Sequence, residues 1–120
     1  MVDAQRVRAL GEQLPRTEIA YVRDSMKLRV RSIVYAAVSP DETLMGFGFP
    51  KEERAALVSS RPDVFLMPVP SDERFHWVRV RLAMVDEAEM RELVVDAWRM
   101  CVPKFLFREW DAAHPSGRPG

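Results

Sequence analysis

The sequence has little of what holds many small proteins together or gives them chemistry. Its single cysteine, Cys101, excludes an internal disulfide and any zinc site built from several cysteines. Charged residues throughout the first 20 positions leave no apolar core for a signal peptide, and no uncharged run approaches the roughly 20 apolar residues of a membrane span. We therefore expect a cytoplasmic protein with no membrane partner.

The chain also lacks net charge, with 18 basic and 18 acidic residues. Strong non-specific binding to a polyanion depends on an excess of lysine and arginine, so the balance argues against that class of protein. The charges are nevertheless distributed unevenly. Residues 1–31 carry seven basic and four acidic side chains, whereas residues 86–92 carry four acidic and one basic. A neutral protein with this distribution can still have a basic face.

Catalytic and nucleotide-binding motifs are missing as well. The sequence has no GxGxxG, GxxxxGK[ST], GxSxG or HExxH pattern. Gly46-Phe47-Gly48 matches only a fragment of a phosphate loop and lies within a strand pattern. The carboxylates of residues 86–92 are typical of the first turn of a helix, and Cys101 lies on the apolar stripe of that helix. The sequence thus predicts no enzyme, no cofactor and no metal site.

The apolar residues of the sequence recur with two periods, one typical of helices and one typical of strands. Asp3 is a candidate N-cap for a first helix, and apolar residues at helical spacing mark further helices. Period-two alternation marks strands, clearest at residues 76–82. We expect helices at 3–14, from Pro50, from about 86 to 101 and from Pro103 to about Ala113, and strands at 26–31, 33–38, 43–49, 64–69 and 76–82.

This order predicts an α+β fold: a two-layer sandwich with a five-stranded antiparallel sheet and helices on one face. The elements follow as helix, three strands, helix, two strands and helix, with a short C-terminal helix. Residues 1–113 form the single expected domain, and residues 114–120 a flexible tail. Val7, Leu10, Val78, Val80, Leu93 and Trp98 are expected in one core.

One group of residues could form a binding surface. The strands expected at 26–31 and 76–82 each have a purely apolar side, which must face the helices. Their cations should therefore share the open side of the sheet. Basic groups beside an aromatic ring can bind nucleic acid by charge attraction and base stacking. A solvated face on which arginine stems cover the tryptophan is the structural alternative. The candidate binding residues are Lys27, Arg29, Arg31, Trp77, Arg79 and Arg81, with Lys104 as an extension from a helix start.

Several segments resemble the MmcQ/YjbR family, in the family's order and spacing from Val7 to Asp111. They are VRALGEQLP, LRVRSIVYAAV, GFPKEERAALVSSRPDVFLMP, WVRVRL, ELVVDAWRMCVPKFL and FREWD. The resemblance implies a CyaY-like α+β fold with a double-wing motif, and DNA binding assigned largely by analogy. It matches the family's lysine to Lys104 and its two tryptophans to Trp77 and Trp98. It implies no established enzymatic activity, cofactor or substrate.

Two functions remain open at this stage. The first is weak, non-specific DNA binding through the basic sheet face. The second is a protein-binding module, similar to a chaperone or an adaptor, that uses the same surface or an edge strand. The acidic ridge with which frataxins bind iron is absent from the first helix, which has Arg6 and Arg8 between Asp3 and Glu12. Salt dependence separates the two functions, because phosphate binding weakens steeply with added salt.

Overall fold

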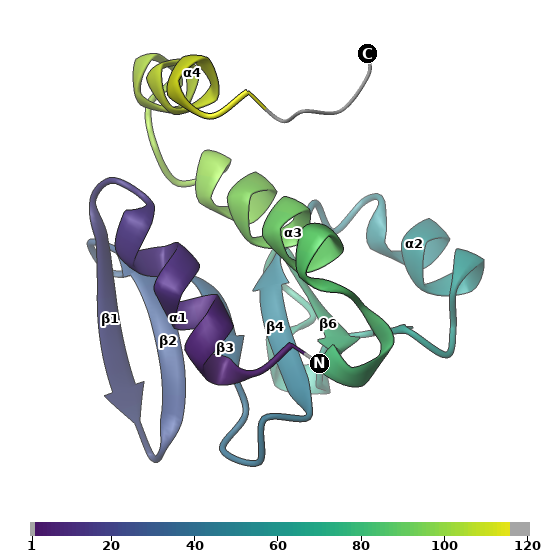
Figure 1. Ribbon diagram of the computed structural model, residues 1–120. Coiled ribbons are helices and arrows are strands. Elements are labelled where there is room, and N and C mark those ends of the chain that lie inside the picture. The colour runs from purple at the N-terminus through teal and green to yellow at the C-terminus, as the bar shows by residue number, and fades with distance from the viewer. Residues whose placement is uncertain (1, 116–120) are drawn as a thin grey trace.

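The computed structural model describes residues 2–115, which form one six-stranded sheet and four α-helices (Figure 1). The α-helices are α1 (Ala4–Gln13), α2 (Arg54–Ser60), α3 (Glu87–Arg99) and α4 (Lys104–Ala113). The strands are β1 (Thr17–Val22), β2 (Ser25–Val30), β3 (Ile33–Val38), β4 (Leu44–Gly48), β5 (Phe65–Leu66) and β6 (Trp77–Arg81). Two short 3₁₀ turns, η1 (Pro70–Asp72) and η2 (Leu82–Met84), flank β6.

All neighbouring strands pair antiparallel, in the order β1-β2-β3-β4-β6-β5. The expected α+β class and antiparallel sheet are confirmed, but the expected number of five strands is wrong. The additional strand is β1, so four strands rather than three separate α1 from α2. A two-residue turn, Arg23-Asp24, joins β1 to β2, and both residues have positive φ angles (51° and 67°). Such a turn suits the twist of a hairpin but usually contains glycine or asparagine, which is why the sequence did not reveal it.

The expected boundaries of two other elements also change. The strand expected at 64–69 pairs only at Phe65 and Leu66, and β5 lies at one edge of the sheet. Pro68, two residues after the end of β5, has no N–H to donate to a ladder. The helix expected from Pro50 begins at Arg54, because residues 51–53 form a turn instead. β6 agrees closely with the alternation that predicted it.

Side-chain capping explains where α1 and α3 begin. The amide of Arg6 donates to Asp3 Oδ1 at 2.9 Å, which confirms the expected N-cap of α1. The amide of Ala4 donates to Glu42 Oε1 at 2.8 Å, so the β3–β4 loop also caps this helix. Asp86 caps α3 by accepting from the amide of Glu89 at 2.8 Å. The first turns of α1 and α3 are thus stabilised by carboxylates that accept hydrogen bonds from their free N–H groups.

The C-terminal helix α4 runs from Lys104 to Ala113, as expected from Pro103. Of the tail expected at 114–120, the structure describes His114 and Pro115. The His114 ring stacks on Trp110 with centroids 3.6 Å apart, and its amide donates to the Trp110 carbonyl at 2.8 Å. The remaining tail residues lie outside the described part of the chain.

The core lies between the sheet and the two helices, α1 and α3, that cover one of its faces (Figure 1). One row of cross-strand partners is buried throughout and runs across five strands. Its members are Met26, Val38, Met45, Val80 and Phe65. Of the six expected core residues, five are buried and Leu93 is half-buried.

Trp98 anchors the helical layer. Its side chain is fully buried, its ring contacts Trp110 edge-on, and its Nε1 donates to the Pro15 carbonyl at 3.0 Å. This hydrogen bond satisfies the polar atom of a buried indole and ties α3 to the segment that leads into β1. Trp98 therefore joins α3, α4 and the start of the sheet.

One arginine is buried at the base of α2. Arg54 is 9% exposed, and its guanidinium donates to three backbone carbonyls. These are Phe75 at 2.9 Å, Glu73 at 2.5 Å and Trp77 at 3.4 Å. An arginine offers five donors in a fixed fork, so one side chain can organise the whole loop that precedes β6.

Candidate functional site

The face of the sheet opposite α1 and α3 carries most of the candidate binding residues. Register shows this directly, because cross-strand partners share a face. Lys27 pairs with Ala37, Ala37 with Gly46, and Gly46 with Arg79. The row continues to Ala20 on β1 and to Leu66 on β5. Lys27 and Arg79 therefore lie on one surface, which we call the open face.

The open face is basic. Arg29 is the next residue of β2 on the same side as Lys27, and Arg81 is the next residue of β6 on the same side as Arg79. Arg29 and Arg81 lie toward opposite ends of the sheet, because β2 and β6 run in opposite directions. Glu18 of β1 lies directly opposite Arg29, and their charged atoms approach to 3.8 Å. Along the paired strands that the structure describes, this face thus carries four cations and one carboxylate.

Arg79 has a second, structural task. Its Nε and Nη2 atoms donate to the carbonyl of Met67, at 3.0 and 2.8 Å. These bonds hold the end of the short strand β5 against β6. The charge remains on the open face, but the guanidinium is fixed in one position. Arg79 is therefore a poor choice for a variant intended to test charge alone.

The middle of the open face is shallow because Ala37 and Gly46 have almost no side chain. The indole of Trp77 covers Gly46: a Cβ built on this glycine would lie 2.5 Å from Cζ2 and 2.6 Å from Nε1 of the ring. Glycine is required there by the close approach of the ring. Trp77 is half-buried, with one side of its ring against the backbone. The space above Gly46 is thus filled by a side chain of the protein itself.

Two candidate residues lie outside this row of strand positions. Arg31 was expected on the strand with Lys27 and Arg29, but it lies in the two-residue turn between β2 and β3 with a φ of 58°. Lys104 is the first residue of α4, which packs on α3 through the contact between Trp98 and Trp110. Figure 1 shows α4 beyond the end of the sheet, so Lys104 does not extend the row across the strands.

Lys27 and Arg81 are the cations of this face with the fewest interactions with other side chains. Neither makes an ion pair within residues 2–115, and Arg81 is exposed at the end of β6. Lys27 is half-exposed between the small residues Ala20 and Ala37. Both head groups can therefore contact an anion without breaking an internal bond.

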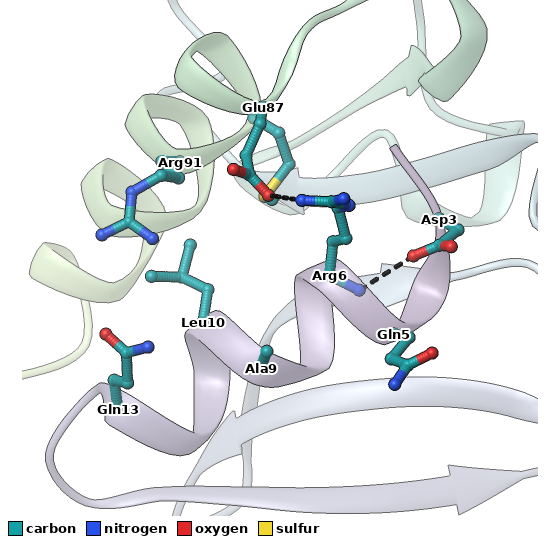
Figure 2. Close-up of a pocket in the computed structure, with 9 residues that line it drawn as sticks. Asp3, Gln5, Arg6, Ala9, Leu10, Gln13, Glu87 and Arg91 are labelled. Carbon is teal, nitrogen blue, oxygen red and sulfur yellow. Dashed lines mark hydrogen bonds and ion pairs between the residues drawn. The ribbon is translucent and has the colours of Figure 1, made fainter. Parts of the chain in front are cut away.

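The helical side has a groove of about 450 Å³ between α1 and α3 (Figure 2). Arg6 and Glu87 form an ion pair of 2.7 Å across it. Figure 2 shows Arg91 and Gln13 toward the other end of the groove, separated from that ion pair by Leu10. The pair neutralises the charge that would attract an anion, and hydrogen bonding to Glu87 raises the pKa of Arg6 above its usual value. This groove therefore has less to offer a charged ligand than the open face.

The place of Cys101 on the apolar stripe of its helix predicts a buried thiol, but the residue is half-buried. Its Sγ lies 3.7 Å from the carbonyl of Ala97, one helical turn back in α3. Burial raises the pKa of the thiol, so less of the reactive thiolate forms at neutral pH.

Within residues 2–115, no group of three or more His, Cys, Asp or Glu side chains is arranged to hold a metal ion. In the same range no helix is long and apolar enough to cross a membrane.

Sequence reasoning missed the part of the open face that β1 contributes, including Glu18 and Ala20. A signal was present: in Thr17–Val22, β-branched and aromatic residues alternate with the positions that carry Glu18 and Ala20. It also missed Arg54, because one arginine in a polar helix start looks like surface. Only the three carbonyls that converge on it identify its role.

Comparison with known proteins agrees with this architecture. The chain belongs to the YjbR family, whose profile matches residues 12–100, and the resemblance to the MmcQ/YjbR family is thereby confirmed. The crystal structure of Deinococcus radiodurans protein DR2400, which carries a DUF419 domain, is similar with a TM-score of 0.74. The alignment covers 99% of this chain and 91% of that one at 17% identity, so it supports the fold alone. No curated protein matches this chain in sequence. Membership of the family brings no established activity with it.

Proposed function

We propose that this protein binds DNA, weakly and without sequence preference, through the open face of its sheet. The observation that supports the proposal is the row that joins Lys27 to Arg79 across four adjacent strands. Neighbouring strands lie about 4.8 Å apart, so the backbone positions of Lys27 and Arg79 are about 14 Å apart across a shallow floor. Ala37 and the Trp77 ring, which covers Gly46, form that floor.

This geometry suits contact with a phosphate backbone. Arg29 and Arg81 extend the two cationic positions along their strands. Glu18 offsets part of the charge of Arg29, so the Arg79 and Arg81 side of the floor is the more basic one. The outward side of the Trp77 ring offers a surface on which an unpaired base can stack, an interaction of about 1–3 kcal/mol per base. Contacts of this kind fix position but do not read sequence. With few phosphates neutralised and no net charge on the protein, the affinity should be low.

The test is a titration of labelled single-stranded and duplex DNA at two salt concentrations. The informative variant is Lys27→Gln/Arg81→Gln, because these two side chains have no ion pair within residues 2–115. Losing two phosphate contacts should weaken binding and reduce the slope of log K against log salt by about two. Binding by Arg79→Gln would be ambiguous, since that change also releases the Met67 carbonyl.

The matched control is Arg91→Gln/Arg108→Gln. It removes the same amount of charge from α3 and α4, on the helical side of the molecule. We expect the control to bind DNA nearly as the wild type does. If the wild type does not bind at low salt, or if both double variants lose affinity equally, the proposal is wrong. A ligand that then binds this face with little salt dependence would favour the protein-binding function.

A further inference from the structure

The two edges of the sheet differ in how well they are protected. At one edge, β5 has only two residues and is followed by Pro68, so it offers almost no ladder to another strand. At the other edge, β1 is six residues long and pairs with β2 without a bulge. It has no proline and no lysine, and its one charged residue is Glu18. Tyr21 and Val22 are 60% and 48% exposed. In Figure 1, β1 forms the free left margin of the sheet.

The backbone groups that β1 presents outward follow from its turn. In a two-residue hairpin, the residues that flank the turn form a hydrogen-bonded pair, here Val22 and Ser25. The N–H and C=O groups of alternate residues therefore point away from β2, which places those of Ile19 and Tyr21 on the outer edge. The amide of Thr17, next in this series, already donates to the Leu14 carbonyl at 3.2 Å. Ile19 and Tyr21 are thus the positions that can exchange bonds with another strand.

We propose that two copies of this chain associate through β1, antiparallel, about a two-fold axis at Ala20. In this register Ile19 of one copy exchanges both backbone hydrogen bonds with the partner's Tyr21, and the reverse pair forms by symmetry. The register uses the free backbone groups of Ile19 and Tyr21, and it leaves the Thr17 amide bonded to the Leu14 carbonyl. The two sheets become one continuous sheet, and their open faces become one surface.

Side chains in this register are compatible on both faces. On the helical side, Ile19 meets the partner's Tyr21, an aliphatic and aromatic pair that is favourable across strands. At the axis the two Ala20 side chains meet in a pair without hydrogen bonds, where the backbones come closest and small residues fit. On the open face, Glu18 lies opposite the partner's Val22. No like charges meet within the paired strands.

The helix above the edge has a charge pattern that also complements itself. Arg8 Nη1 donates to the Tyr21 hydroxyl at 2.7 Å, so it lies at the level of Tyr21. Glu12 is one helical turn further along and pairs with Arg8 at 3.8 Å. Its neighbour Gly11 lies against Ile19. An antiparallel arrangement brings Arg8 toward the partner's Glu12, and Glu12 toward the partner's Arg8. This complementarity favours a second copy over an unrelated strand as the occupant of the edge.

The first experiment measures mass in solution by sedimentation velocity over a range of concentrations, without nucleic acid. The wild type should show a monomer–dimer equilibrium. Ala20→Glu should raise the dissociation constant at least about fivefold, because the two new carboxylates meet at the axis. The same side chain lies opposite Lys27 of its own sheet, so the fold should not suffer. Ala20→Gln, equal in size and uncharged, is the matched control and should dimerise more tightly than Ala20→Glu.

A second variant tests the register. In a background of Cys101→Ser, Ala20→Cys places two thiols at the axis, where Cβ atoms lie about 4.5–5.5 Å apart. Mild oxidation should produce a covalent dimer rapidly. Ala37→Cys, on the same face but on the interior strand β3, should react slowly. A wild type that is monomeric at every concentration overturns the proposal and leaves β1 to a strand of a different protein. Equal rates of cross-linking at the two positions would also overturn it.

Discussion

The indole ring of Trp77 rests on the backbone of Gly46, at the centre of the sheet's open face. The two residues belong to neighbouring strands and are diagonal to each other, since Gly46 pairs with Arg79 and Trp77 with Gly48. An aromatic ring that covers a strand glycine replaces the packing that the glycine lacks. The pair therefore contributes both to the stability of the sheet and to the shape of the proposed binding surface.

The first prediction concerns this contact. Gly46→Ala should lower the free energy of unfolding by about 1–3 kcal/mol, because the new methyl group displaces the ring. Urea denaturation measures the change, and tryptophan fluorescence reports the displaced ring. The loss should shrink in a Trp77→Ala background, where nothing remains to clash. An equal loss in both backgrounds would show that the ring does not limit the space at Gly46.

A second prediction concerns Arg54. Arg54→Met should cost about 1–3 kcal/mol of stability, because it leaves the carbonyls of Glu73 and Phe75 without their donor. Hydrogen exchange should become faster in the loop that precedes β6 before it changes in β2 and β3. Arg108→Met, at an exposed position of α4, is the control and should change stability by less than about 0.5 kcal/mol. Equal effects of the two substitutions would contradict the role assigned to Arg54.

The β2–β3 turn gives a third prediction. Arg31 holds a φ of 58°, a conformation that costs an ordinary residue about 1–2 kcal/mol and glycine much less. Arg31→Gly should therefore leave stability unchanged or raise it, whereas Arg31→Val should lower it. Thermal unfolding of the two variants provides the measurement. If Arg31→Gly is the less stable of the two variants, residue 31 does not hold a positive φ angle in solution.

A fourth prediction concerns pH. Asp41 accepts hydrogen bonds from the hydroxyls of Ser39 (2.7 Å) and Thr43 (2.8 Å), and these bonds lower its pKa below the usual range. A carboxylate with a lowered pKa contributes stability above its unfolded pKa of about 3.9 and loses it as pH falls through the folded value. The stability difference between wild type and Asp41→Asn should therefore be constant near neutrality and shrink in acid. Thermal unfolding from pH 7 to pH 2.5 tests this, and a difference that grows in acid would contradict it.

The sequence predicted the open face well because one physical rule decides it. On β2 and β6 one side of the strand is wholly apolar, so Lys27, Arg29, Arg79 and Arg81 had to share the other side. The alternation needed no knowledge of the partners. By contrast, the bonds from Arg79 to Met67 join positions 12 residues apart through a strand of only two residues. No local pattern reports such a contact.

Two of the errors, the missed strand β1 and the placement of Arg31, have a common source in turns that contain no glycine. Arg23, Asp24 and Arg31 all adopt positive φ angles that sequence rules reserve for glycine or asparagine. The first hairpin was therefore missed together with β1. For the same reason Arg31 was assigned to a strand when it belongs to a turn. Glu42, with a φ of 61°, repeats the pattern in the β3–β4 loop.

The placement of the three tryptophans gives the protein a built-in optical probe. Trp98 and Trp110 are 0% and 7% exposed and contact each other within the helical layer. Trp77 is half-buried on the opposite side of the sheet. A collisional quencher such as iodide or acrylamide should therefore act mainly on Trp77, and any molecule bound at the open face should shield it. Binding at this face can thus be followed by intrinsic emission, without attaching a dye to the protein.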